Sequence, residues 1–401
     1  MKAVPINIDD NQKTFFSARN MRVQLSSSHS IETPYRALSN SELIAKAQMP
    51  SEIALHSEVS GIHNDLSVND VQKMLNDNEV VKKKIRNLEN YRQRMQHSSM
   101  IFSLLQPCKT ARDRVLFTDK QREKFLEITI GMQMLANFDY ICVPWVGFDN
   151  IKSTINQFKK IENTCDKELI FFLDLKSKSG FLDEISKYLI ELIDSDRIHA
   201  VGVVHHPIVD TLVSHVDLWN SFKEKNAAII VANVERSDLD YDHLSSIHLS
   251  EFILGDIFLP RVMHPFGTKE DGEKGPQKKS KPKIKLNEKF LFFDRTNLTV
   301  SPIGAIQNKS WAETIASTIP DPRVRDVINN FSEAEIDREK FQVVSAISKV
   351  YEQIASSKEL EISKKFIGSG ETDEYVNEKP ILSHVLKNTV GSLKKRKTFF
   401  S

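Results

Sequence analysis

Five short apolar runs recur along the middle of this chain at intervals of about 30 residues, the length of a strand–helix–strand unit. They span residues 140–145, 169–174, 200–205, 228–233 and 256–260. The runs are continuously apolar and do not alternate with polar residues, which is typical of strands buried on both faces of a parallel sheet. One stretch of helical character separates each pair of runs. The pattern therefore predicts strands and helices in alternation.

Two further runs extend this array, at residues 101–106 and 289–293. Six or seven strands with helices between them indicate an α/β fold, a complete or partial (β/α)8 barrel of the TIM type. A doubly wound open sheet is the alternative. The sequence contains neither the Gly-x-Gly-x-x-Gly turn of a dinucleotide-binding sheet nor a P-loop, so we expect no cofactor.

The sequence divides into three expected regions. Residues 1–96 form an N-terminal extension, with a hairpin across the polar turn Ser26–His29 and helices after it. Residues 97–305 form the barrel-like domain. Residues 306–401 form a helical appendage with a flexible basic tail at Lys394–Lys397. Within the barrel region, residues 266–288 are rich in Gly, Pro and Lys and nearly free of apolar residues, which predicts a mobile basic loop.

Charge and cysteine content narrow the class of protein. With 55 basic and 54 acidic residues, the net charge of +1 predicts no strong global attraction to nucleic acid or membrane, so any such attraction must be local. The three cysteines are scattered and form no Cys-x-x-Cys pair, which argues against a zinc site or a disulfide framework. The sequence has no apolar window long enough to span a membrane and no apolar signal core at its start. We therefore expect a cytoplasmic protein without a metal.

Polar side chains are dense where the apolar runs end. In a barrel of parallel strands, chemistry comes from the carboxyl ends of the strands. The residues at those positions are Gln106, Trp145, Asp149, Asp174, Lys176, His205, His206, Asn233, Glu235, Arg236, Asp256, Arg261, Asp294 and Arg295. We expect a site at this rim, although polar residues also belong there simply because the chain emerges into water.

Two of these residues are candidates for acid–base work. Asp174 ends a fully apolar run, so a low-dielectric wall would lie behind its carboxyl group and raise its pKa. A helix-capping or loop-bonding role is the alternative for Asp174. His205 and His206 are adjacent on a strand, so at most one faces the barrel interior. One of them suits proton transfer because imidazole titrates near neutral pH, and we assign that role to His205.

Residues 80–96 predict a basic helix that carries Lys82, Lys83, Lys84 and Arg86 among other cations. Such a helix can face the phosphates of a nucleic acid. It is more often a solvated surface, and acidic neighbours dilute its charge.

Several segments resemble the tRNA-guanine transglycosylase superfamily, whose members are (β/α)8 enzymes that exchange a base in tRNA or, in some relatives, in DNA. Residues 16–25 and 30–34 are similar to the opening hairpin of that family. The stretches 171–176, 199–205, 228–233 and 254–261 follow in the family's order with similar spacing. The family's Asp-Ser-Gly-Gly segment and its zinc signature near the C-terminus have no counterpart in this sequence.

The resemblance implies a mechanism. Residues 254–261 are similar to the strand that carries the family's nucleophilic aspartate just before a Pro and an Arg, so Asp256 would attack the ribose C1′ and form a covalent intermediate. Asp174 or His205 would assist it. Gln106, Asn233, Arg261 and Asp294 would bind substrate, and the partner would be tRNA or DNA. Two alternatives stay open: a non-catalytic nucleic-acid-associated protein, and a barrel enzyme that acts on a small phosphorylated metabolite.

Overall fold

A computed structural model describes residues 1–11, 16–47, 57–148, 150–177, 179–237, 243–253, 255–261, 291–302, 309–319, 324 and 338–388. The basic loop expected at 266–288, the tail Lys394–Lys397 and the rim residue Asp149 lie outside these ranges. Among the described helices, none is long and apolar enough to cross a membrane.

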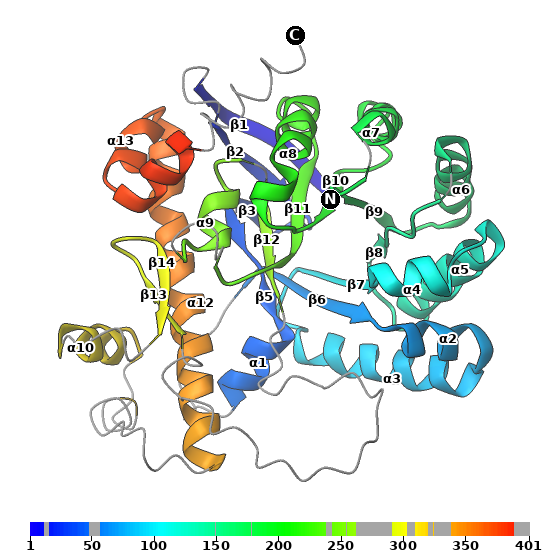
Figure 1. Cartoon of the computed structure of the whole chain (residues 1–401), viewed down its shortest axis with the longest axis horizontal. Helices are drawn as coiled ribbons and strands as arrows, with labels where there is room; N and C mark the ends of the chain where they lie inside the picture. Colours follow the sequence, from blue (N-terminus) through cyan, green and yellow to red (C-terminus); the bar gives the residue numbers. More distant parts are fainter. Residues whose placement is uncertain are drawn as a thin grey trace.

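Nine parallel strand segments form one barrel-shaped sheet (Figure 1). In chain order they are β4 (Tyr35–Arg36), β5 (Leu38–Ser39), β6 (Val59–Leu66), β7 (Met100–Pro107), β8 (Tyr140–Val143), β9 (Glu168–Asp174), β10 (Ala200–Val204), β11 (Ala228–Val234) and β12 (Ile257–Pro260). β4 pairs with β12 and β5 pairs with β6, while Ala37 alone separates β4 from β5. One short stretch of chain therefore joins the two ends of the sheet, and the predicted (β/α)8-like barrel is confirmed.

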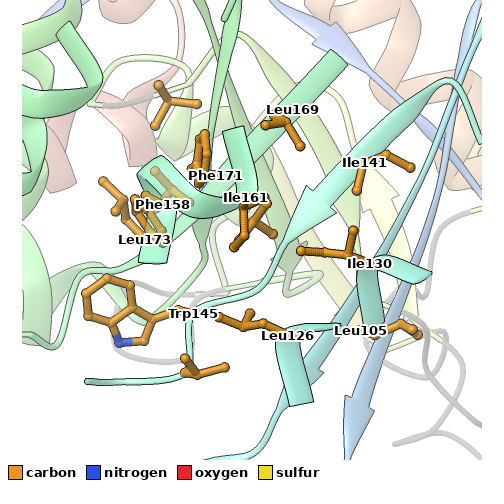
Figure 2. Packing of buried hydrophobic residues seen from close by; sticks show 14 of the residues in the cluster. Leu105, Leu126, Ile130, Ile141, Trp145, Phe158, Ile161, Leu169, Phe171 and Leu173 are labelled. Carbon is orange, nitrogen blue, oxygen red and sulfur yellow. The ribbon is translucent and has the colours of Figure 1, made fainter. Parts of the chain in front are cut away.

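Helices surround the sheet in alternation with its strands. They are α1 (Asn40–Ala47), α2 (Val68–Asn76), α3 (Asn78–Arg94), α4 (Lys109–Arg114), α5 (Asp119–Leu135), α6 (Ile151–Thr164), α7 (Ser179–Asp194), α8 (Ile208–Phe222) and α9 (Ser246–Ser250). Side-chain caps fix several starts, as where Thr118 and Gln121 form a reciprocal capping box at α5. Figure 2 shows how α5 and α6 cover the sheet, with Phe158 of α6 against Phe171 of β9.

Alternate residues of each strand point inward, and these buried side chains fill the barrel interior. They form a cluster separate from the one that packs between the sheet and the helices. On β10 the inward positions are small. A Cβ atom added to Gly202 would lie 2.5 Å from the ring of Phe172 on the neighbouring strand β9. Glycine at this position lets a phenylalanine occupy the centre of the barrel, so the interior is a packed core and not a channel.

A three-stranded antiparallel sheet covers the end of the barrel where the strands begin. It consists of β1 (Lys2–Asn11), β2 (Phe16–Gln24) and β3 (Ser30–Glu32), and the β2–β3 hairpin confirms the predicted one. Met21, Val23 and Ile31 belong to the same buried cluster as the barrel interior. The amino ends of the barrel strands are therefore closed by apolar packing.

The C-terminal part adds a hairpin and helices beside the barrel. They are β13 (Leu291–Asp294), β14 (Thr299–Pro302), α10 (Lys309–Thr318), α12 (Arg338–Ser369) and α13 (Thr372–Asn377). We expected residues 289–293 to form a barrel strand, but the described part of that run, from Leu291 on, pairs antiparallel with β14 outside the barrel. The barrel takes its remaining strands from residues 35–39 and from β6, so it begins at Tyr35 and not at residue 97.

Candidate active site at the carboxyl ends of the strands

Asp174 is the last residue of β9 and forms the centre of a polar cluster at the rim where the barrel strands end. Its Oδ1 accepts a hydrogen bond from Nε2 of His206 at 2.7 Å and from the main-chain N–H of Lys176 at 3.0 Å. Its Oδ2 accepts a hydrogen bond from Nη1 of Arg112 at 2.8 Å. The side chain of Asp174 is 8% exposed, whereas those of Arg112 and His206 are 17% and 21% exposed, so two partly exposed partners hold a buried carboxylate.

The carboxyl group of Asp174 is ionised at neutral pH. Burial alone would raise its pKa, as we expected from the sequence. The hydrogen bond from His206, the charge of Arg112 and the bond from the N–H of Lys176 together outweigh burial, and they hold the pKa well below its usual range. The expectation of a raised pKa is therefore wrong. It considered only burial behind the apolar strand and not the hydrogen-bond and charge partners of Asp174 at the rim.

His206 reaches Asp174 because side chains alternate along a strand. Val204 lies opposite Asp174 in the β9–β10 register and belongs to the interior cluster. His206, two residues further along, continues on the same side.

His205, which we expected to transfer protons, occupies a different environment. It is buried, and neither of its ring nitrogens finds a hydrogen-bond partner among the described residues. Burial, with smaller contributions from His215, His206 and Arg261, lowers its pKa to about 3. The imidazole is thus neutral at physiological pH, and His206 is the histidine that the structure joins to Asp174.

Asp256 lies at the opposite end of the barrel from Asp174, because it precedes β12 and does not follow it. Its side chain is fully buried and forms a two-pronged ion pair with Arg19, with Nε to Oδ1 at 3.0 Å and Nη2 to Oδ2 at 2.6 Å. It also accepts a hydrogen bond from the N–H of Ile229 at 2.7 Å. A carboxylate enclosed in this way cannot reach a substrate, so the structure does not place Asp256 where a nucleophile would need to be.

Two residues expected to bind substrate have structural partners instead. Gln106 is buried at the rim and holds the main chain of Trp145 from both sides, with Nε2 donating to O at 2.8 Å and Oε1 accepting from N at 3.2 Å. Asp294 ends β13, outside the barrel, where it accepts hydrogen bonds from the N–H of Thr296 and the side chain of Asn297.

Asn233 and Arg261 do lie at the rim. Asn233 has a φ of 63° where the register between β11 and β12 shifts, and its Oδ1 is buried without a hydrogen-bond partner among the described residues. Arg261 follows β12 and pairs with Glu235 at 2.7 Å, with both side chains about half exposed. His63 of β6 is not among the residues singled out from the sequence. It is buried, its pKa is lowered by burial to about 4, and its Nε2 has no hydrogen-bond partner within the described ranges.

The arrangement suits proton transfer and electrostatic stabilisation. Asp174 orients the imidazole of His206 and supplies a fixed negative charge at the edge of a low-dielectric barrel. In the described part of the chain, no three His, Cys, Asp or Glu side chains gather closely enough to hold a metal ion. Comparison of the chain with protein-family models and with curated proteins finds no match.

Proposed function

We propose that this protein is a barrel enzyme that exchanges a base in tRNA or DNA by a transglycosylase-like reaction at the carboxyl ends of its strands. The observation that supports this most directly is the hydrogen-bonded cluster of Asp174, His206 and Arg112 at that rim. Catalytic groups in barrel enzymes lie at this end of the strands. The resemblance of residues 16–34 and 254–261 to the transglycosylase superfamily supports the choice of substrate class.

In this proposal the catalytic roles belong to Asp174 and His206 at the rim and not to Asp256. When the bond between the ribose C1′ and the base nitrogen breaks, its electron pair goes to the base and positive charge develops on the sugar. The ionised Asp174 stabilises that charge. Protonated His206 gives a proton to the departing base, and the neutral imidazole then takes one from the incoming base as the new bond to C1′ forms. Both oxygens of Asp174 already accept hydrogen bonds, so its role is electrostatic.

The described residues offer less support for an enzyme that acts on a small phosphorylated metabolite. Such a site needs guanidinium groups open to a phosphate. At the rim, Arg112 is paired with Asp174, and Arg261 is paired with Glu235. These carboxylates would have to give up their partners before a phosphate could bind.

A base-exchange assay tests the proposal. The protein would be incubated with bulk tRNA, and separately with DNA, together with labelled guanine. We expect label to enter with the wild type and to fall at least 100-fold with Asp174→Asn and with His206→Gln, in line with the loss of an acid–base group. Asp194→Asn is the matched control, because it removes an exposed carboxylate that pairs with Lys225 far from the rim. Absence of label from the wild type, in either nucleic acid, would contradict base exchange.

A further inference from the structure

Helix α3 concentrates positive charge in a chain that is otherwise nearly neutral. It carries six basic residues and two acidic ones, Glu79 and Glu89, and so has a net charge of +4, whereas the whole chain has +1. All other residues together therefore have a net charge of −3. A local concentration of this kind attracts polyanions even when the global charge does not.

The charges of α3 are ordered along one face of the helix. Lys83, Arg86, Asn90 and Arg94 are spaced three, four and four residues apart, and all four side chains are exposed. Residues at this spacing lie above one another on a helix. From Lys83 to Arg94 the row extends about 16 Å at a rise of 1.5 Å per residue.

The cations of this row have no carboxylate partners. Lys83, Arg86 and Arg94 form no ion pair with any residue that the structure describes, and the guanidinium of Arg94 lies over the ring of Tyr91 at 5.8 Å. Lys160, Lys187 and Lys225, in contrast, are each paired with a carboxylate, from Glu127, Glu184 and Asp194 respectively.

The row starts beside the rim that carries the candidate active site. Lys84, next to Lys83, pairs with Asp70 at 3.2 Å. Asp70 belongs to the capping box of α2 with Ser67, and Ser67 directly follows the last residue of β6. The amino-terminal half of α3 is thus tied to the carboxyl end of a barrel strand (Figure 1).

We propose that this face of α3, made of Lys83, Arg86, Asn90 and Arg94, is the surface along which the phosphate backbone of a nucleic acid lies when one of its bases enters the barrel rim. The three cations contact phosphates, and the amide of Asn90 donates a hydrogen bond between them. Each strand of a duplex presents a phosphate about every 3.4 Å along its axis, so the row spans several phosphates. This inference rests on the proposed nucleic-acid substrate.

Salt-dependent binding tests the inference. Binding of the full-length protein to labelled single-stranded DNA and to bulk tRNA would be measured over a range of salt concentrations for the wild type and for the triple variant Lys83→Gln, Arg86→Gln, Arg94→Gln. A plot of log affinity against log salt has a negative slope, and each lost phosphate contact reduces the steepness of that slope by about 0.7 for a single strand. We expect the slope of the triple variant to be less steep than that of the wild type by about 2.

The matched control is the triple variant Lys160→Gln, Lys187→Gln, Lys225→Gln, which removes the same charge from paired positions. Its slope should equal that of the wild type. Equal slopes for the two triple variants, or no binding by the wild type, would overturn the inference.

Base exchange separates this result from the proposed function. At low salt and saturating tRNA, the α3 variant should still exchange base, whereas Asp174→Asn should bind with an unchanged slope and lose at least 100-fold of its exchange activity. A reduced slope in the α3 variant without any exchange by the wild type would keep the binding surface and reject the enzyme. The opposite pattern, exchange with an unaltered slope, would keep the enzyme and reject the surface.

Discussion

Within the described ranges, an arginine–aspartate pair stands at each end of the barrel, and the two pairs have different environments. At the amino ends of the strands, Arg19 and Asp256 are fully buried, and the remaining guanidinium donors are bound by the carbonyl oxygens of Phe222, Lys223 and Ala227. At the carboxyl ends, Asp174 is also buried, but Arg112 and the histidine that shares its carboxylate, His206, are partly exposed. The same two residue types thus form a fully enclosed pair at one end and a pair with a partly exposed arginine at the other.

The difference follows from what covers each end. The sheet β1–β3 places apolar side chains against the barrel interior, so the ion pair beneath it is isolated from water and needs every hydrogen bond satisfied. The Arg19 guanidinium also lies over the ring of Trp219 at 5.1 Å. At the rim, main-chain and side-chain donors hold Asp174 in place, and two of those donors, Arg112 and His206, are partly exposed to solvent. Enclosure, and not residue type, therefore separates the two pairs.

The largest effect is expected at the closed end. Asp256→Asn leaves the guanidinium of Arg19 buried without its counter-charge, which should lower the free energy of unfolding by about 3–5 kcal/mol. Urea denaturation would measure this loss. The double variant Arg19→Met, Asp256→Leu should recover part of it, because both charges are then absent. A single Asp256→Asn variant as stable as the wild type would remove the contrast between the two ends.

A smaller loss is expected for a rim residue with a structural role. Gln106→Leu removes the partners of both main-chain groups of Trp145, so the free energy of unfolding should fall by roughly 2 kcal/mol. Denaturant unfolding checks the loss. If Gln106 instead contacts substrate, the variant would keep its stability and lose binding.

Asp174→Asn should cost only about 1 kcal/mol at neutral pH, since the new amide oxygen still accepts a hydrogen bond from His206. The cost should depend on pH. The folded state holds the pKa of Asp174 below its unfolded value of about 3.9, so its stabilising contribution is present above that pH and is lost as pH falls through the folded pKa. The stability difference between wild type and variant should therefore shrink below about pH 4. Denaturation at pH 7 and pH 3 measures it, and a difference that grows in acid would contradict the assigned ion pair.

The smallest change in stability is expected for His199, at the amino ends of the strands, and its pH dependence is opposite to that of Asp174. His199 precedes β10, and hydrogen bonds to Glu168 and Asp196 raise its pKa above the ordinary value even though burial acts against them. Its contribution is therefore present below about pH 6.5 and lost as pH rises through the raised pKa. His199→Gln should cost less than about 1 kcal/mol at pH 5.5, and less still at pH 9. Chemical denaturation at both pH values, with Lys187→Gln as a surface control, measures the change.

Six barrel strands were predictable because each is a continuous apolar run of the right length. β6 was not, since its sequence contains Gly61, His63, Asn64 and Asp65. The glycine is needed inside the barrel, where a Cβ atom would lie 2.8 Å from the ring of Phe102 and 2.9 Å from the side chain of Leu259. β6 is stabilised by contacts with segments distant in sequence, which a local sequence pattern does not reveal.

The candidate site was predictable in part for the same reason. Asp174 follows an apolar run, and that position alone places it at the rim. Arg112 lies on a short helix after β7 and meets Asp174 only in three dimensions. The expected position of Asp256 at the rim is wrong, because Asp256 precedes β12 and so stands at the amino ends of the strands.

Closure of the sheet through β4 and β5 has a consequence for biosynthesis. The residues of β4 leave the ribosome well before their partner β12, which follows more than two hundred positions later. During synthesis the early segment must wait, with Met21, Val23 and Ile31 exposed, until β12 has been made. Contacts of such sequence separation form slowly. We therefore expect nascent chains that stop before residue 257 to bind chaperones, and chains that include β12 to be released.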